Sequence, residues 1–179
     1  MRTLVLLSTL AAGPALAECP AAPNIIDAES EIFAQIQSAE TEMAARGLSN
    51  GLWELWTQAP DEPAQALLDR GMNARASYNF VEATDALDRL VDYCPDYAEG
   101  YNQRAFVAFL RQDFEAALVD LDRAIALSPR HTGALSGKAL TLMGLGRNDE
   151  AQVVLREAVD LNPWLGERHL LTDPPGEEL

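Results

Sequence analysis

A repeat of fixed length constrains this chain more than any other feature. When the sequence is shifted against itself by 34 residues, segment 98–131 aligns with segment 132–165 without an insertion, and segment 64–97 aligns in the same frame. A constant period of this length is typical of stacked supersecondary units. The matching columns hold a cation, small residues, leucines or a closing proline: Arg70/Arg104/Lys138, Gly71/Ala105/Ala139, Ala83/Ala117/Ala151, Leu87/Leu121/Leu155, Leu90/Ala124/Ala158 and Pro95/Pro129/Pro163.

Each aligned unit is predicted to form two helices, because its apolar residues recur at steps of three and four. A proline closes each unit at a point where a helix cannot continue. The small residues of two columns are expected to let the paired helices approach closely, and the leucines to fill the space between units. The expected first helices are 64–77, 98–111 and 132–145, and the expected second helices are 81–93, 115–127 and 149–161.

These three units resemble the tetratricopeptide repeat (TPR), a helix–turn–helix unit of the same length. The resemblance covers residues 64–163. It implies an all-α fold, a right-handed α-solenoid of antiparallel helix pairs, with a concave groove that binds peptides or protein surfaces. It names no partner.

The same frame extends upstream in a weaker form. We interpret residues 27–63 as a degenerate N-terminal hairpin that caps the stack, because terminal repeats are usually atypical. One helix is predicted from Asp27 to Arg46, with Gly47 ending it. Trp53 and Trp56 then fall in leucine columns, which favours a core role over an exposed ligand cage. Residues 18–26 are expected to be an extended lead-in, and residues 166–179 a short capping helix and a tail.

The first 17 residues have the pattern of a secretory signal peptide. A basic start at Arg2 precedes an apolar stretch, and the segment ends in Ala15-Leu16-Ala17. Cleavage is expected after Ala17, which makes the chain an exported bacterial protein of the periplasm. The charged Glu18 before Cys19 disfavours a lipoprotein. No later segment is long and apolar enough to suggest a membrane span in the mature chain.

The chain is acidic, with 28 Asp and Glu residues against 13 Lys and Arg and a net charge of −15. This balance argues against nucleic-acid binding, which requires a positive footprint. Two interpretations of the acidity stand: it keeps the protein soluble, or it steers a basic partner.

Two cysteines in an exported chain invite a disulfide. The ends of the second helices and the starts of the first helices share one edge of such a stack, so Cys94 and the lead-in lie on the same edge. The residues from Cys19 to Asp27 reach roughly 26 Å when extended, which makes a Cys19–Cys94 bond sterically possible. The alternative is two free thiols.

The resemblance also implies which side chains face the groove. Two positions of the Lys/Asn arrangement that grips a C-terminal carboxylate in some family members hold Leu68 and Met72 here, so that arrangement is absent. The alternative is that the N-terminal or C-terminal segment of the chain covers the groove. The expected groove residues are Leu68, Met72, Arg75, Asn102, Phe106, Phe109, Ser136, Leu140 and Met143.

The cationic column Arg70, Arg104 and Lys138 has two interpretations. A ladder of positive groups could bind an acidic peptide. Alternatively, Asp120 lies opposite Arg104 and Asp85 near Arg70, so the column fastens each helix hairpin. The second interpretation is favoured, since a related subset of the repeats carries arginine at this position.

No motif for catalysis, metal binding or a cofactor is present. His131 and His169 lie far apart and away from the cysteines in sequence, and there is no glycine-rich phosphate loop or nucleophile elbow. We therefore expect a non-enzymatic scaffold or adaptor with a protein or peptide partner. Two alternatives stay open: a chaperone or assembly factor for exported clients, and a structural subunit whose groove is filled by its own termini.

Overall fold

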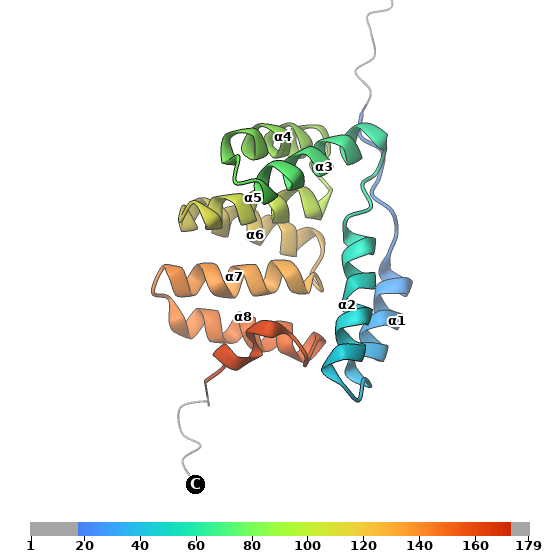
Figure 1. The fold of residues 1–179 in the computed structure, drawn as a ribbon, viewed down its shortest axis with the longest axis vertical. Helices are drawn as coiled ribbons and strands as arrows, with labels where there is room; N and C mark the ends of the chain where they lie inside the picture. The colour runs from blue at the N-terminus through green and yellow to red at the C-terminus, as the bar shows by residue number, and fades with distance from the viewer. Residues whose placement is uncertain (1–17, 173–179) are drawn as a thin grey trace, which may run out of the picture.

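The protein is an all-α solenoid of antiparallel helix pairs, which confirms the predicted fold class (Figure 1). The computed structural model describes residues 18–172, so the predicted signal peptide and residues 173–179 lie outside the described residues. The helices are α1 (Ile26–Gln37), α2 (Glu42–Trp56), α3 (Glu62–Ala76), α4 (Phe80–Tyr93), α5 (Ala98–Leu110), α6 (Phe114–Leu127), α7 (Thr132–Gly144) and α8 (Asn148–Leu161), followed by the 3₁₀ helix η1 (Gly166–Leu170).

The three repeat units fold as predicted, with every helix boundary within two residues of its expected position. Local signals explain this precision. Asp61, Asn79 and Asp113 precede α3, α4 and α6, and each side chain accepts a hydrogen bond from a backbone N–H of the first turn. The turn inside each unit contains one residue with positive φ, and these residues keep the repeat spacing: Tyr78, Gln112 and Gly146.

Small residues set the separation of the paired helices. A Cβ atom added at Gly71 of α3 would lie 2.6 Å from Cγ of Leu87 in α4, closer than real Cβ contacts. In the next unit the facing positions, Ala105 and Ala117, are fully buried. Helices α3 and α4 therefore approach so closely at position 71 that only glycine fits there without a shift of Leu87.

The N-terminal hairpin differs from its prediction. The expected single helix from Asp27 to Arg46 is two helices, because the chain turns at residues 38–41. Thr41 begins α2, and its side chain accepts a hydrogen bond from the Ala44 N–H. Gly47 lies inside α2 and does not end a helix. Met43 continues the spacing of the apolar stripe formed by Ile32, Phe33, Ile36 and Ala39, but it is 86% exposed.

The hairpin α1–α2 is also not a fourth layer of the stack. It stands across the ends of the helices of the second and third repeats, and its upper end leads into α3 of the first repeat (Figure 1). Phe33, Ile36 and Leu52 form a small core against which Leu161 and Trp164 of the last unit pack. The Gln37 side chain donates a hydrogen bond to the backbone oxygen of Asp160, 3.1 Å away. This clasp, residues 26–56, therefore joins the N-terminal end of the chain to its last repeat.

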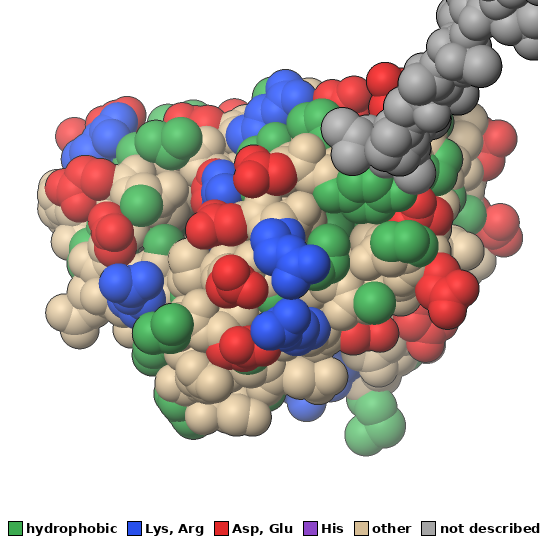
Figure 2. All heavy atoms as spheres, turned by 90° about the horizontal axis from the view of Figure 1, so that it is seen from above, with side chains coloured by type: hydrophobic (Ala, Val, Ile, Leu, Met, Phe, Trp, Pro, Cys, Tyr) green, Lys and Arg blue, Asp and Glu red, His purple; other side chains and the backbone are tan. Residues whose placement is uncertain are grey.

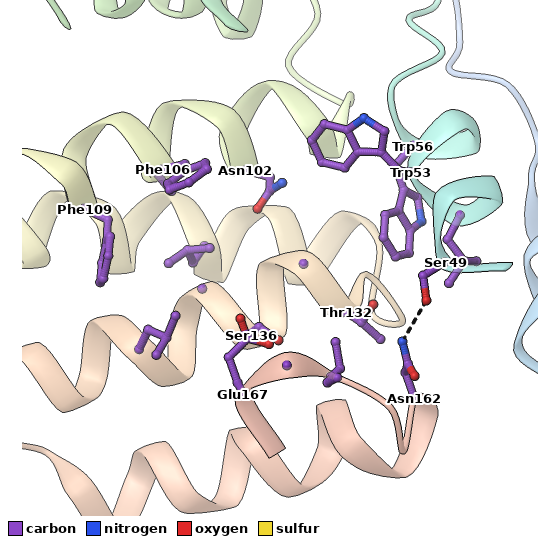
Figure 3. Close-up of a pocket in the computed structure, with 18 of the residues that line it drawn as sticks. Ser49, Trp53, Trp56, Asn102, Phe106, Phe109, Thr132, Ser136, Asn162 and Glu167 are labelled. Carbon is purple, nitrogen blue, oxygen red and sulfur yellow. Dashed lines mark hydrogen bonds between the residues drawn. The ribbon is translucent and has the colours of Figure 1, made fainter. Parts of the chain in front are cut away.

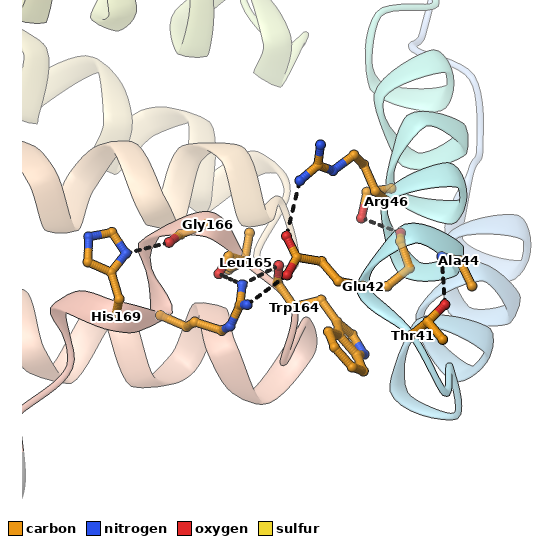
Figure 4. A network of polar contacts seen from close by, with 11 residues as sticks. Thr41, Glu42, Ala44, Arg46, Trp164, Leu165, Gly166 and His169 are labelled. Carbon is orange, nitrogen blue, oxygen red and sulfur yellow. Dashed lines mark hydrogen bonds and ion pairs between the residues drawn. The ribbon is translucent and has the colours of Figure 1, made fainter.

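The C-terminal segment completes this closure. The expected capping helix is the short 3₁₀ element η1, and Arg168 within it donates hydrogen bonds to the backbone oxygens of Trp164 and Leu165. The same guanidinium lies 3.0 Å from Glu42 at the start of α2, and Glu42 also pairs with Arg46 (Figure 4). The C-terminal element η1 thus contacts the N-terminal hairpin at the start of α2.

A disulfide anchors the lead-in. Cys19 is bonded to Cys94, with their Cα atoms 5.2 Å apart, which confirms the pairing expected over two free thiols. Cys94 follows α4 directly and is 2% exposed. The lead-in is therefore tied covalently to the first repeat.

The acidic residues do not gather into one patch on the face that Figure 2 shows. This face is the α3–α4 end of the stack, and basic side chains are interspersed among acidic ones across its middle. No helix within residues 18–172 combines the length and the apolar character that crossing a membrane requires.

Candidate functional site

A cavity of about 510 Å³ lies between the clasp and the inner helices of the second and third repeats (Figure 3). Helices α5 and α7 form one side, α2 forms a second, and residues 162–167 form a third. No described residue fills it, so neither α2 nor the described C-terminal residues 162–172 close the groove. Instead, these segments act as its walls.

The walls are largely aromatic and aliphatic. Trp53 and Trp56 come from α2, Phe106 and Phe109 from α5, and Leu140 from α7. Trp56 is 7% exposed and belongs to a core cluster, as predicted, whereas Trp53 is 38% exposed. The prediction that both tryptophans are core residues is therefore correct only for Trp56.

The structure brings together five of the nine expected groove residues. The residues that line the cavity are Asn102, Phe106, Phe109, Ser136 and Leu140. Leu68 does not face a groove, because it is fully buried in the core cluster of the first repeat, and Met72 packs against the same cluster. Arg75 lies over the Phe106 ring beside the cavity, and Met143 is half-buried outside it.

The repeat register did not predict the remaining wall residues. Ser49 and Trp53 of α2, and Asn162 and Trp164 after α8, line the cavity only because the clasp crosses the stack. Asn162 donates a hydrogen bond to the Ser49 hydroxyl, 3.2 Å away, and so joins the two walls (Figure 3). The repeat register carries no information about this crossing. The pair of tryptophans three residues apart was the one available signal.

A buried carboxylate beside the cavity binds several polar side chains. Glu99 of α5 is 1% exposed and accepts hydrogen bonds from Gln103 Nε2 at 2.6 Å and Asn102 Nδ2 at 3.0 Å. A third contact, of 2.8 Å, joins it to Nε2 of His131. Because the Ala134 N–H donates to His131 Nδ1, the proton of the neutral ring is on Nε2 and points at Glu99.

The clasp rests on this buried histidine. The Trp56 ring stacks on His131 with their centroids 3.9 Å apart, and its Nε1–H donates to Glu29 of α1, 3.0 Å away. His131 also caps α7 and is 1% exposed. It is therefore a structural residue that positions Trp56 and, through Glu99, Asn102. Among residues 18–172, no group of three or more His, Cys, Asp or Glu side chains is placed to hold a metal ion.

The cationic column fastens the repeats. Arg104 donates to both carboxylate oxygens of Asp120 at 2.7 Å and to Asp88 of the preceding unit at 2.9 Å. The hydrogen bonds that Arg104 donates to Asp120 raise the pKa of Arg104. Lys138 pairs with Asp122 at 2.7 Å. Arg70 pairs with Glu82, which corrects the expected partner Asp85. Glu82 lies two residues after the start of α4, within reach of the long arginine side chain.

We predict that Asp120→Ala and Arg104→Ala destabilise the protein by similar amounts, about 2 kcal/mol each, because each leaves a poorly solvated charged partner. The double variant should cost less than the sum, with a coupling of about 1 kcal/mol or more. Urea unfolding of the four proteins measures this cycle. A silent Asp120→Ala, beside an Arg104→Ala that abolishes partner binding, would instead assign Arg104 to the ligand.

The comparisons with known proteins agree with this architecture. Residues 108–163 match the family model described as tetratricopeptide repeat. A TPR repeat-containing protein of Rhizobium etli is 26% identical over 133 residues, covering 74% of this chain and 65% of that protein. The Nematostella vectensis homolog of tetratricopeptide repeat protein 36 is 40% identical over 70 residues, or 39% of this chain and 38% of that protein. The chain thus spans less than two thirds of these relatives.

Solved structures show the same fold. The first TPR of Spaghetti (RPAP3), bound to the HSP90 peptide SRMEEVD, has a TM-score of 0.58 and 24% identity over 60% of this chain and 85% of that one. The TPR2B domain of yeast Sti1 in complex with an Hsp70 peptide gives 0.57 and 20% over 60% and 89%. The three helix pairs are similar to tetratricopeptide repeats in sequence, and their fold is that of a TPR solenoid.

Proposed function

We propose that the protein is a non-enzymatic interaction module that binds a segment of a partner protein in the cavity between α2, α5 and α7. The cavity itself is the main support for this proposal. Its volume of about 510 Å³ falls in the range of ligand-binding sites, and its walls are aromatic and aliphatic with a few polar groups. Solved proteins of the same fold bind peptides of HSP90 and Hsp70, which supports a peptide as the class of ligand.

We further propose that it works in the periplasm as an exported protein. The signal-peptide pattern of residues 1–17 supports export, and the Cys19–Cys94 disulfide fits an oxidising compartment. A specific adaptor and a chaperone for exported clients share this groove chemistry. They differ in their partners, since an adaptor binds one folded protein stoichiometrically and a chaperone binds several unfolded ones.

Site-specific photocrosslinking in cells tests the proposal. A photoreactive residue at Phe106, whose side chain is 42% exposed, is expected to give one discrete crosslinked product. The same residue at Val153, 57% exposed and absent from the cavity lining, is the matched control and should give none.

The Trp53→Ala substitution removes an aromatic wall of the cavity and should abolish the product at Phe106 while leaving the fold intact. Equal crosslinking at Phe106 and Val153, or a product that Trp53→Ala leaves unchanged, would contradict the proposal. The number of distinct products separates an adaptor from a chaperone.

A further inference from the structure

Three buried polar atoms lack a partner, and all three belong to the inner helices of the repeats. Within residues 18–172, the buried side-chain nitrogen and oxygen atoms without a hydrogen bond are Nε of Arg75 on α3, Oε1 of Gln103 on α5 and Oγ of Ser136 on α7. Buried polar groups are normally satisfied. Gln103 is 1% exposed, Ser136 is 6% exposed, and both line the cavity. The unpaired atoms of Gln103 and Ser136 are shielded from solvent, whereas the Arg75 side chain is only partly buried and so is open to a partner.

Arg75 is the exception among the cations of the inner helices. Its guanidinium carbon lies 4.2 Å from the centroid of the Phe106 ring, and it makes no ion pair within the described residues. Burial lowers the pKa of Arg75, whereas the paired Arg70 and Arg104 have raised pKa values. Glu99 contributes an opposing charge, but its oxygens already accept from three neutral donors. Arg75 is therefore a partly desolvated cation that has no ion-pair partner within the described residues and lies over an aromatic ring.

The Phe106 ring connects this cation to the cavity. The ring makes a cation–π contact with Arg75, and it is also part of the cavity wall together with the apolar side chains of Phe109 and Leu140. Three charged side chains line the cavity: Glu42 and Arg46, which pair with one another, and Glu167 in the wall that residues 162–167 form. A group that enters the cavity therefore meets mostly uncharged apolar surface, while a negative group beside it meets Arg75.

We propose that Arg75, Phe106 and the cavity together recognise a peptide segment that presents a carboxylate beside an apolar side chain. The apolar side chain enters the cavity, and the carboxylate pairs with Arg75. Only one aromatic ring separates the guanidinium from the cavity. Side chains two residues apart on an extended segment lie about 6.6 Å from one another on the same face, so one segment can present both groups. The inference rests on the proposed function, because it specifies the ligand of the same cavity.

The overall charge of −15 does not oppose this pairing at contact distance. Exposed charges farther away than about 8 Å are largely screened at physiological salt. A guanidinium that is already partly desolvated gains a charge-assisted hydrogen bond on meeting a carboxylate. The local cation therefore decides the preference.

Two blocked pentapeptides are the probes, acetyl-Ala-Leu-Ala-Asp-Ala-amide and acetyl-Ala-Asp-Ala-Leu-Ala-amide, each compared with its Asp-to-Asn analogue by calorimetric titration of the full mature chain. For at least one order, the aspartate peptide should bind about tenfold more tightly than its asparagine analogue, which is the usual size of a charge-assisted contact. Arg75→Gln should remove this difference without changing the melting temperature by more than a few degrees. Arg75→Lys should keep part of it.

Arg89→Gln is the matched control, since Arg89 is an exposed cation on α4 away from the cavity lining, and it should leave the tenfold preference unchanged. Equal affinity for the aspartate and asparagine peptides in the native chain overturns the inference, and so does a failure of both aspartate peptides to bind. A loss of affinity for both analogues in Arg75→Gln overturns it as well. The Phe106 crosslink is independent of these titrations, so the proposed function can stand when this inference fails.

Discussion

Replacing Glu99 with alanine is expected to lower the free energy of unfolding by about 3–5 kcal/mol. The substitution removes the carboxylate that accepts hydrogen bonds from Asn102, Gln103 and His131 at 2.6–3.0 Å. The three donors are then left without an acceptor in a site where Glu99 and His131 are each only 1% exposed. Deleting one partner of a buried charged network costs far more than deleting an exposed one. Urea unfolding followed by tryptophan fluorescence measures the loss, and Trp56 reports directly because it stacks on His131.

Glu115→Ala is the matched control for this substitution. Glu115 occupies the first turn of α6 as Glu99 occupies the first turn of α5, so both substitutions remove a similar interaction with the helix dipole. Glu115 is exposed, and its replacement should cost less than about 1 kcal/mol. If Glu99→Ala destabilises the protein no more than Glu115→Ala, the network does not hold the clasp in place.

Loss of the Cys19–Cys94 disulfide is expected to lower stability by about 4 kcal/mol. The bond joins residues separated by 75 positions, and in the chain-entropy account a loop of this length restricts the unfolded state by that amount. The comparison is between oxidised protein and protein held with a reductant, both unfolded in urea. The midpoint should move to a lower denaturant concentration on reduction.

The Cys19→Ala/Cys94→Ala variant controls for other effects of the reductant, and its midpoint should be the same in both conditions. Before reduction, neither thiol of the native protein should react with an alkylating reagent. A reductant that leaves the native midpoint unchanged would show that the lead-in adds nothing to the stability of the repeats.

The repeats could be predicted closely because each local signal agrees with the register. The caps at Asn79 and Asp113, the positive-φ turn positions and the closing prolines all recur at the same spacing. The clasp could not be predicted in the same way. Its apolar stripe continues through the turn at residues 38–41, so periodicity alone cannot distinguish one long helix from two short ones. The Thr41 cap decides between them.

The residues of the cavity also fall into a predictable group and an unpredictable group. The α5 and α7 residues of the cavity follow from the repeat resemblance, since the inner face of a first helix is fixed by the fold. Whether Leu68 is buried or faces the groove depends on which residues cover α3, and whether Trp53 lines the cavity depends on the position of the clasp. Both are set by contacts between segments remote in sequence. The pairing of Arg70 with Glu82 depended on side-chain reach, which column alignment does not describe.

The clasp changes how a protein of this architecture unfolds. In an open array each repeat contacts only its neighbours, so the end repeats fray independently and folding spreads from any point. Here three side-chain hydrogen bonds join segments that are far apart in sequence: Ser30 with Arg130 (100 residues apart), Ser49 with Asn162 (113) and Glu42 with Arg168 (126). The last repeat therefore cannot open without releasing the N-terminal hairpin. The chain gains one cooperative transition in place of stepwise fraying, together with slower folding through its long-range closures.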